Sequence, residues 1–205
     1  MRVSWCFLAA TGCAPHLTSP EETDDPDEVW VAPENDWPSA APPEGLRAEG
    51  FEVGEVVPDF RLLDQFDQTV SLWQFYGSVV VLDVSTMWCS PCQKLAESTE
   101  AMWQEHKDEG FVYVTVLAQD VEGNPPDNAD LNAWAAVKPS SDEDDITAPV
   151  ISDPEGGYSD DALALTGSQY PVVLVLDREM RASTLVIPPE DALLEDAVEA
   201  ELDED

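Results

Sequence analysis

Two cysteines three positions apart, Cys89 and Cys92, have the types and spacing that most directly indicate chemistry in this chain. Such a pair can form a redox-active disulfide, supply half of a zinc site, or close a small structural clip. A structural zinc site needs four ligands, and the chain has no second Cys-X-X-Cys. His106 would lie about 21 Å from Cys92 along one helix at about 1.5 Å per residue, too far to share a metal. We therefore expect no metal at this pair.

The pair lies where a strand is expected to end and a helix to begin. The apolar run 79–84 predicts a buried central strand, and the amphipathic pattern from about 90 to 107 predicts a helix. Cys89 would then sit at the helix N-terminus, where unpaired N–H groups and the helix dipole stabilise a thiolate. Cys92, one turn later, could close a disulfide and release a bound partner. A structural clip is disfavoured, because so short a loop gains little stability from cross-linking.

The other expected elements alternate along the chain. Short strands at 60–63 and 69–72 predict an N-terminal hairpin, and further strands are expected at 111–118 and 148–153. Helices are expected at 128–137 and 158–167, followed by a β-hairpin at 170–187 and a closing helix at 189–205. That last helix is expected to turn four apolar side chains inward: Leu193, Leu194, Ala197 and Val198. Strands alternating with helices predict an α/β protein with helices layered on a sheet.

The composition indicates one acidic domain with extra chain. The 205 residues suit a single domain with tails, and the 43% that are hydrophobic are enough for one core. The formal net charge is −36, with eight Lys and Arg residues. Such a surface repels phosphate, so we expect no nucleic-acid partner. The acidic runs are either a solvated coat or a docking patch for a basic partner.

The first residues predict export. Arg2 precedes an apolar stretch at 3–10, and small residues then lead to Cys13. The pattern resembles a secretory signal and also a bacterial lipoprotein signal, in which the cysteine is lipidated and becomes the new N-terminus. We therefore expect a signal peptide at 1–12 and a lipid anchor on Cys13 that holds the protein to the membrane on the periplasmic side of the bacterial envelope. Plain secretion and a cytosolic chain are the alternatives.

The segment 13–48 is acidic, rich in proline and without periodicity, which predicts a disordered tether. Trp30 and Trp37 within it are expected to pack loosely against the domain rather than to form a binding motif. The folded domain is expected at 49–205. It contains an acidic insertion near 121–145, which either borders the site or forms a plain loop.

The residues around the cysteine pair resemble a known superfamily. The stretch "DVSTMWCSPC", which includes Asp83 and Trp88, is similar to the active site of thioredoxin-like proteins. In "GSQYPVVLVLD", Tyr170 precedes Pro171, which matches the proline that opens a later strand of that family in the cis form. The opening "VPDFRLLDQFDQTVSLWQFYGSVVVLDV" is similar to exported, membrane-tethered thiol–disulfide oxidoreductases and to the alkyl hydroperoxide reductase/thiol-specific antioxidant group.

This resemblance implies a thioredoxin-like fold: a central mixed β-sheet flanked by helices, with an N-terminal β-hairpin extension. It implies that no cofactor is required and that the partners are protein thiols and disulfides. It also implies that Pro171 faces the cysteines, and that Trp88, Tyr170 and Pro171 contact the partner. Tyr170 is bulkier than the Ile, Val or Thr usual at its position.

Asp83 matches the buried aspartate of thioredoxin. It lies inside an apolar run, where an unpaired charge is costly, so burial is expected to raise its pKa. A carboxyl group under the disulfide could accept and return the proton of Cys92. The alternative is a solvated residue at a strand end.

Three functions fit these residues. In an exported thiol–disulfide oxidoreductase, Cys89 would attack a partner's disulfide and Cys92 would resolve the complex. The family resemblance implies a reductant, because Pro91 stands where strong oxidants of the family have His. In a peroxiredoxin-like peroxidase, Thr86 would stand three residues before the reactive cysteine, but Leu82 occupies the position where that motif has proline. A non-catalytic lipoprotein would use the same fold as an interaction module.

Overall fold

A computed structural model describes residues 30–137 and 144–204. The expected signal peptide, Cys13 and the first part of the expected tether fall on residues 1–29 and lie outside the described residues, so they stay predictions. None of the helices in the described ranges has the length and apolar character that crossing a membrane requires.

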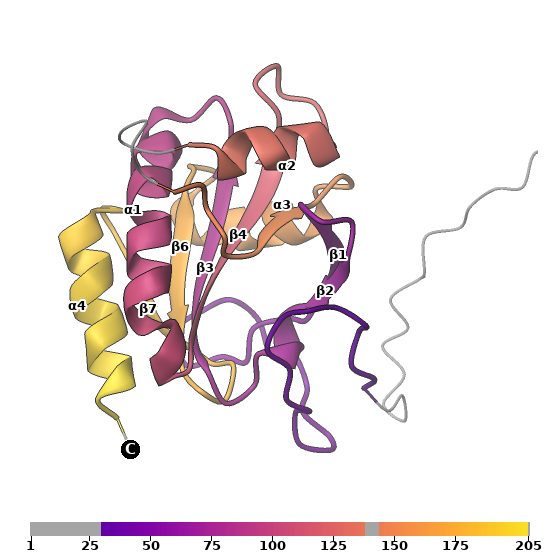
Figure 1. The fold of residues 1–205 in the computed structure, drawn as a ribbon. Coiled ribbons are helices and arrows are strands. Elements are labelled where there is room, and N and C mark those ends of the chain that lie inside the picture. The colour runs from indigo at the N-terminus through magenta and orange to yellow at the C-terminus, as the bar shows by residue number, and fades with distance from the viewer. Residues whose placement is uncertain (1–29, 138–143, 205) are drawn as a thin grey trace, which may run out of the picture.

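Among the described residues, one mixed sheet of seven strands forms the centre of the fold (Figure 1). Its order is β2-β1-β5-β4-β3-β6-β7. The strands are β1 Arg61–Asp64, β2 Thr69–Ser71, β3 Val79–Thr86, β4 Phe111–Gln119, β5 Val150–Ser152, β6 Val172–Leu176 and β7 Ala182–Leu185. The strands β3, β4 and β5 are parallel, whereas β6 runs antiparallel to β3. Every residue of β3 is buried, as the apolar run predicts, and this places Asp83 inside the core.

The predicted N-terminal hairpin is confirmed, and it belongs to the same sheet. Strand β2 pairs antiparallel with β1, and β1 pairs antiparallel with β5. The hairpin therefore forms one edge of the sheet, while β3 and β4 at its centre carry the chain into and out of the helix that begins at the cysteine pair.

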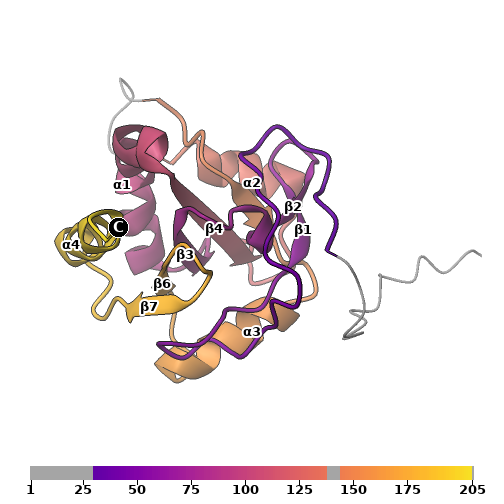
Figure 2. The same ribbon diagram turned by 90° about the horizontal axis from the view of Figure 1, so that it is seen from below.

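Four α-helices cover the sheet in the described ranges: α1 Ser90–His106, α2 Asn128–Ala135, α3 Gly157–Leu163 and α4 Asp191–Leu202. The helices α1, α2 and α4 lie on one side of the sheet and α3 on the other (Figure 2). The shared side of α1 and α2 follows from two successive right-handed crossovers between parallel strands. The amphipathic helix predicted at about 90–107 is confirmed as α1, and its buried face contains Leu95, Thr99, Met102 and His106.

The helix predicted at 128–137 is confirmed as α2, so the acidic insertion near 121–145 is not a plain loop. In α2, Leu131 and Trp134 are buried, and the Asp127 carboxylate caps the N-terminus. One expectation, about the buried face of α4, needs correction. In α4, Leu194 and Val198 are buried as expected, but Leu193 is 42% exposed. Residues four positions apart share a helix face, whereas the neighbour Leu193 is turned about 100° away from Leu194.

The expectation of a disordered tether does not hold for residues 30–48. The indole N–H of Trp37 donates to the buried carboxylate of Asp64 over 2.6 Å, and the indole N–H of Trp30 donates to Ser71 Oγ over 3.1 Å. The side-chain amide of Asn35 donates to the Thr69 carbonyl over 2.7 Å. These donors find partners on the β1–β2 hairpin, and composition alone does not reveal such partners. Both tryptophans therefore contact the domain, as predicted.

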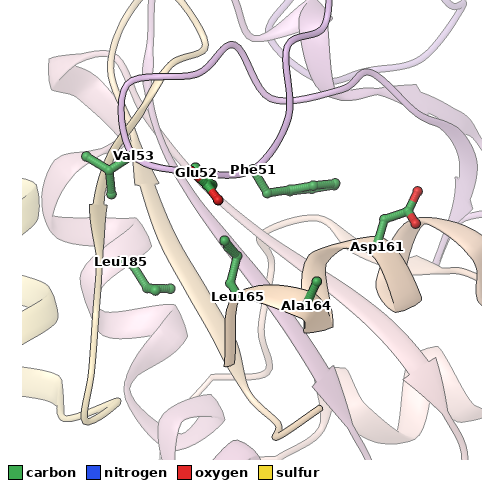
Figure 3. A pocket seen from close by; sticks show the side chains of 7 residues that line it. All are labelled: Phe51, Glu52, Val53, Asp161, Ala164, Leu165 and Leu185. Carbon is green, nitrogen blue, oxygen red and sulfur yellow. The ribbon is translucent and has the colours of Figure 1, made fainter. Parts of the chain in front are cut away.

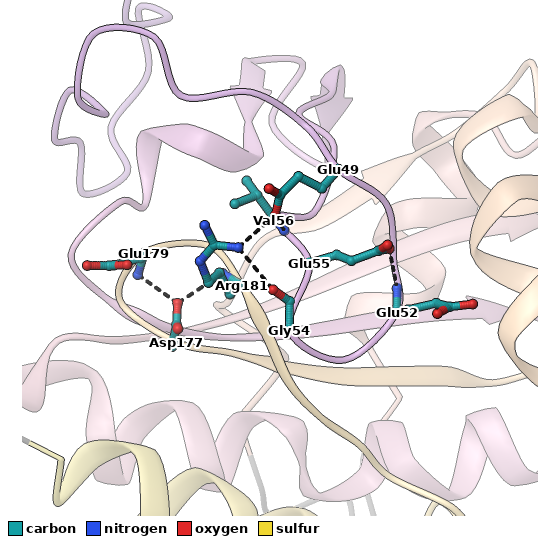
Figure 4. A network of polar contacts seen from close by, with 8 residues as sticks. All are labelled: Glu49, Glu52, Gly54, Glu55, Val56, Asp177, Glu179 and Arg181. Atoms are coloured by element: carbon teal, nitrogen blue, oxygen red, sulfur yellow. Dashed lines mark hydrogen bonds and ion pairs between the residues drawn. The ribbon is translucent and has the colours of Figure 1, made fainter.

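The next segment, residues 49–56, contacts the turn between β6 and β7 (Figure 4). The Arg181 guanidinium donates to the Glu49 carboxylate over 2.7 Å and to the Gly54 carbonyl over 2.9 Å. The Val56 N–H also donates to the Glu49 carboxylate, and these bonds lower the pKa of that carboxyl. The backbones of Val56 and Arg181 form an antiparallel bridge, so this segment is tied to the sheet through main chain as well as side chains.

Candidate active site

Cys89 and Cys92 are joined by a disulfide at the start of α1, with their Cα atoms 5.2 Å apart. Cys89 is the N-cap residue of the helix, and the Cys92 backbone N–H donates to Cys89 Sγ over 3.3 Å. Pro91 occupies the first turn, where a missing N–H removes no helical hydrogen bond. The predicted placement of Cys89 at a helix N-terminus is therefore confirmed. In the reduced state this placement favours a thiolate on Cys89.

The two cysteines differ slightly in their exposure to solvent. Cys89 is 5% exposed, whereas Cys92 is fully buried. Of the two cysteines, Cys89 is therefore the one that an incoming partner meets first, and Cys92 lies in the core. This arrangement suits an attacking thiol at position 89 and a resolving thiol at position 92.

Asp83 lies in the buried centre of β3. Its carboxylate accepts a hydrogen bond from Ser85 Oγ over 2.6 Å and one from the Tyr113 hydroxyl over 3.4 Å. Burial raises the pKa of Asp83 to about 7, and the two hydrogen bonds partly oppose this rise because they favour the charged form. The raised pKa was predicted from the sequence, and it means that this carboxyl group can take or give a proton near neutral pH.

Tyr170 and Pro171 lie at the end of the sheet where β3 leads into the cysteine loop. The peptide bond between them is cis, as the resemblance implied. Strand β6 begins at Val172, which pairs with Val84 near the end of β3. The Tyr170 ring contacts the Trp88 ring edge to face, with centroids 5.8 Å apart, and Trp88 is 50% exposed. The residues next to Cys89 and Pro171 therefore meet in a partly exposed aromatic pair.

Gln119 at the end of β4 holds the loop that leads to Cys89, and sequence reasoning missed it. Its side-chain oxygen accepts from the Trp88 indole N–H over 2.8 Å. Its backbone carbonyl accepts from the Met87 N–H over 3.0 Å. The side chain of Gln93 donates to the Met87 carbonyl from the helix side. Because Gln119 lies thirty-one residues from Trp88, only the pairing of β3 with β4 reveals the contact.

Thr86, the residue that a peroxidase motif would use, is buried at the end of β3. Its hydroxyl has no hydrogen-bond partner among the described residues. Leu82, which replaces the proline of that motif, is a buried residue paired with Val114 and Leu174 in the middle of the sheet. Proline cannot donate to a strand ladder, so this position is used here for sheet pairing.

A separate concave surface lies on the α3 side of the sheet (Figure 3). This cavity of about 440 Å³ is lined by residues 51–53, Asp161, Ala164, Leu165 and Leu185. It is apolar with two acidic residues, and it includes none of the predicted site residues.

Comparison with known proteins agrees with this fold and site. The model of the AhpC/TSA family matches residues 53–182. The thioredoxin-like protein YneN of Bacillus subtilis is 25% identical over 130 residues, which are 63% of this chain and 68% of that protein. The thiol-disulfide oxidoreductase ResA of Bacillus thuringiensis is 28% identical over 110 residues, which are 54% of this chain and 57% of ResA. The chain thus spans little more than half of the length of ResA.

Solved structures with a similar fold include thiol–disulfide proteins. A chain from Chlorobium tepidum assigned as thiol:disulfide interchange protein DsbE is 25% identical, with a TM-score of 0.57 over 75% of this chain and 99% of that chain. The exposed lipoprotein thioredoxin of Streptococcus pneumoniae has the same fold at 24% identity, with a TM-score of 0.53 over 70% of this chain and 99% of that one. The family model covers more than half of the residues, and the sheet, helices and cysteine pair are those of thioredoxin-like proteins. The chain therefore belongs to the AhpC/TSA family of the thioredoxin-like superfamily.

Proposed function

We propose that the protein is an exported thiol–disulfide oxidoreductase that exchanges its Cys89–Cys92 pair with disulfides of partner proteins. The observation that carries the proposal is a disulfide at a helix N-terminus, with Cys89 capping the helix and Cys92 buried in the core. The similarity to ResA, which is named for this chemistry, supports it. The signal-like residues 1–13 support export.

The reaction requires only the two sulfurs and a proton acceptor. The Cys89 thiolate attacks one sulfur of the partner's disulfide, that bond breaks, and a mixed disulfide forms while one partner thiolate leaves. The Cys92 thiol then transfers its proton to the Asp83 carboxylate and attacks Cys89 Sγ. The mixed disulfide breaks, the Cys89–Cys92 disulfide forms, and the second partner thiolate leaves. Two electrons pass from the pair to the partner, so the protein acts as a reductant.

The aromatic pair at the mouth of the site supports a protein partner. Trp88 and Tyr170 flank the two loops that carry Cys89 and Pro171, and Trp88 is half exposed. Aromatic side chains supply contact area at low cost in conformational entropy and are enriched in protein interfaces. We propose that a partner's chain lies against Trp88, Tyr170 and Pro171 while its disulfide reaches Cys89.

Parallel assays of protein disulfide and peroxide test this function. Catalytic amounts of the protein with dithiothreitol are expected to accelerate the reduction of insulin, measured as precipitation of its free B chain. Consumption of hydrogen peroxide by the reduced protein is expected to stay at the rate of an ordinary thiol, because Leu82 replaces the proline of the peroxidase motif. Rapid peroxide consumption without insulin reduction would identify a peroxidase. Inactivity in both assays would support an interaction module.

A further inference from the structure

The mechanism leaves several buried titratable side chains of the described residues unused, and one of them, the phenol of Tyr113, contacts Asp83. It lies in β4, next to β3, and its ring is 1% exposed. The parallel register pairs Tyr113 with Val81 and Thr115 with Asp83. Side chains at positions 81 and 83 of β3, and at 113 and 115 of β4, therefore point to the same face of the sheet. Tyr113 consequently shares a buried face with the proton acceptor of the proposed reaction.

The contacts of the Tyr113 hydroxyl show how it acts on Asp83. It donates to Asp83 Oδ2 over 3.4 Å. The side chain of Thr99 in α1, which is 1% exposed, interacts with the same phenol and lowers its pKa. Burial raises the pKa of Tyr113 well above its usual value, and the negative charges of Asp83 and Asp191 raise it further. The phenol is therefore neutral at physiological pH, and it acts on Asp83 as a hydrogen-bond donor rather than as a charge.

We propose that Tyr113, supported by Thr99, is a positioning residue that holds the Asp83 carboxylate in the charged state needed to take the proton of Cys92 at neutral pH. This inference rests on the proposed thiol–disulfide exchange. A donor to a carboxylate stabilises its ionised form, whereas burial destabilises it. Ser85 supplies one such donor from the same strand, and Tyr113 supplies the second from the neighbouring strand.

The other elements around Asp83 bring few charged groups to it. Strand β6 places the apolar Val173 opposite Asp83. Helix α4 contributes Asp191, whose charge acts on Tyr113 and whose carboxylate accepts from Ser98 Oγ over 2.9 Å. Burial is the one cause that raises the pKa of Asp83, and the Ser85 and Tyr113 hydroxyl groups are the two that lower it. Removal of one of these donors should therefore raise the pKa of Asp83 measurably.

The test isolates the resolution step. The reduced protein is mixed with dithiobis(nitrobenzoate), an aromatic disulfide that releases one coloured thiolate when Cys89 attacks and a second when Cys92 resolves the mixed disulfide. The second phase does not depend on reagent concentration, so its rate reports Cys92 and its proton acceptor alone. In Tyr113→Phe the pH profile of this second phase is expected to move upward by about one pH unit. Near pH 7 the rate should fall about fivefold, since the ionised fraction of Asp83 falls, and the two proteins should converge at high pH.

Three controls make the result specific. Tyr158→Phe removes a hydroxyl that donates to the Pro58 carbonyl over 3.1 Å on the α3 side, and it should leave the profile unchanged. Thr99→Val should move the profile in the same direction by a smaller amount, and it serves if Tyr113→Phe does not fold. In an Asp83→Asn background, Tyr113→Phe should add no further shift.

The outcomes are distinct. A Tyr113→Phe profile that coincides with wild type, or a loss that is equal at every pH, would overturn the role of Tyr113. Failure of the wild-type protein to release the second thiolate would instead contradict the proposed exchange itself.

Discussion

Replacement of Cys89 by serine is expected to reduce the rate of insulin reduction to the uncatalysed background. A serine hydroxyl is not ionised near neutral pH, and it cannot form the mixed disulfide through which thiol exchange proceeds. The fold should survive, because serine is a favoured N-cap residue and the lost disulfide closes only a short loop. The measurement is insulin reduction beside a denaturant melt of the same variant. Activity retained by Cys89→Ser would contradict the assignment of the attacking thiol.

The second large effect is expected from Asp83→Asn and concerns stability as a function of pH. The pKa of Asp83 is about 7 in the folded protein and near the usual aspartate value of 3.8 when the chain is unfolded. Between these values the folded protein holds a proton that the unfolded chain has lost. The stabilisation from this proton is therefore fully present below about pH 4 and is lost as pH rises through about 7. Three pKa units correspond to about 4 kcal/mol.

The variant isolates this contribution, because all other titrating groups are common to both proteins. The difference in unfolding free energy, wild type minus Asp83→Asn, is expected to fall by up to about 4 kcal/mol between pH 4 and pH 8. Above pH 7 the variant should equal or exceed wild type in stability, since a buried charge has been removed. Urea unfolding of the oxidised proteins at a series of pH values measures this difference. A difference that does not change with pH would show that Asp83 does not titrate in this range.

The candidate site could be predicted from the sequence where the signal is local. A cysteine pair between an apolar run and an amphipathic run specifies a strand, a loop and a helix N-terminus, and the structure has all three. Asp83 could be predicted to be buried because its neighbours in the run are apolar and every residue of β3 is buried. The cis state of the Tyr170–Pro171 bond followed from resemblance alone.

The partners of these residues could not be predicted, because they depend on strand register. Tyr113 reaches Asp83, and Gln119 reaches Trp88, only because β4 pairs with β3 in one particular alignment. Shifting that register by one residue would turn Tyr113 to the other face of the sheet. Nothing in the local sequence of β4, an almost continuous apolar run, distinguishes these alignments.

Residues 30–48 show the opposite limitation, because their composition predicts disorder that the structure does not have. Residues 30–48 are rich in proline and acidic residues, which is typical of disordered chain. A few donors with buried partners nevertheless place this segment on the domain, above all the Trp37 indole N–H on the Asp64 carboxylate. Hydrogen bonds to charged acceptors are among the stronger ones, so a small number of them can offset an unfavourable composition.

The most direct test of the account is to trap the mixed disulfide in Cys92→Ser. Without the resolving thiol, the complex formed by Cys89 should persist with a partner protein, survive denaturing gel electrophoresis, and dissolve on addition of dithiothreitol. Peptide mapping by mass spectrometry is expected to show the cross-link at Cys89 in the oxidised sample. Absence of covalent complexes in Cys92→Ser, together with their accumulation in Cys89→Ser, would show that the attacking and resolving roles are reversed. Absence from both variants would contradict thiol–disulfide exchange as the function of this site.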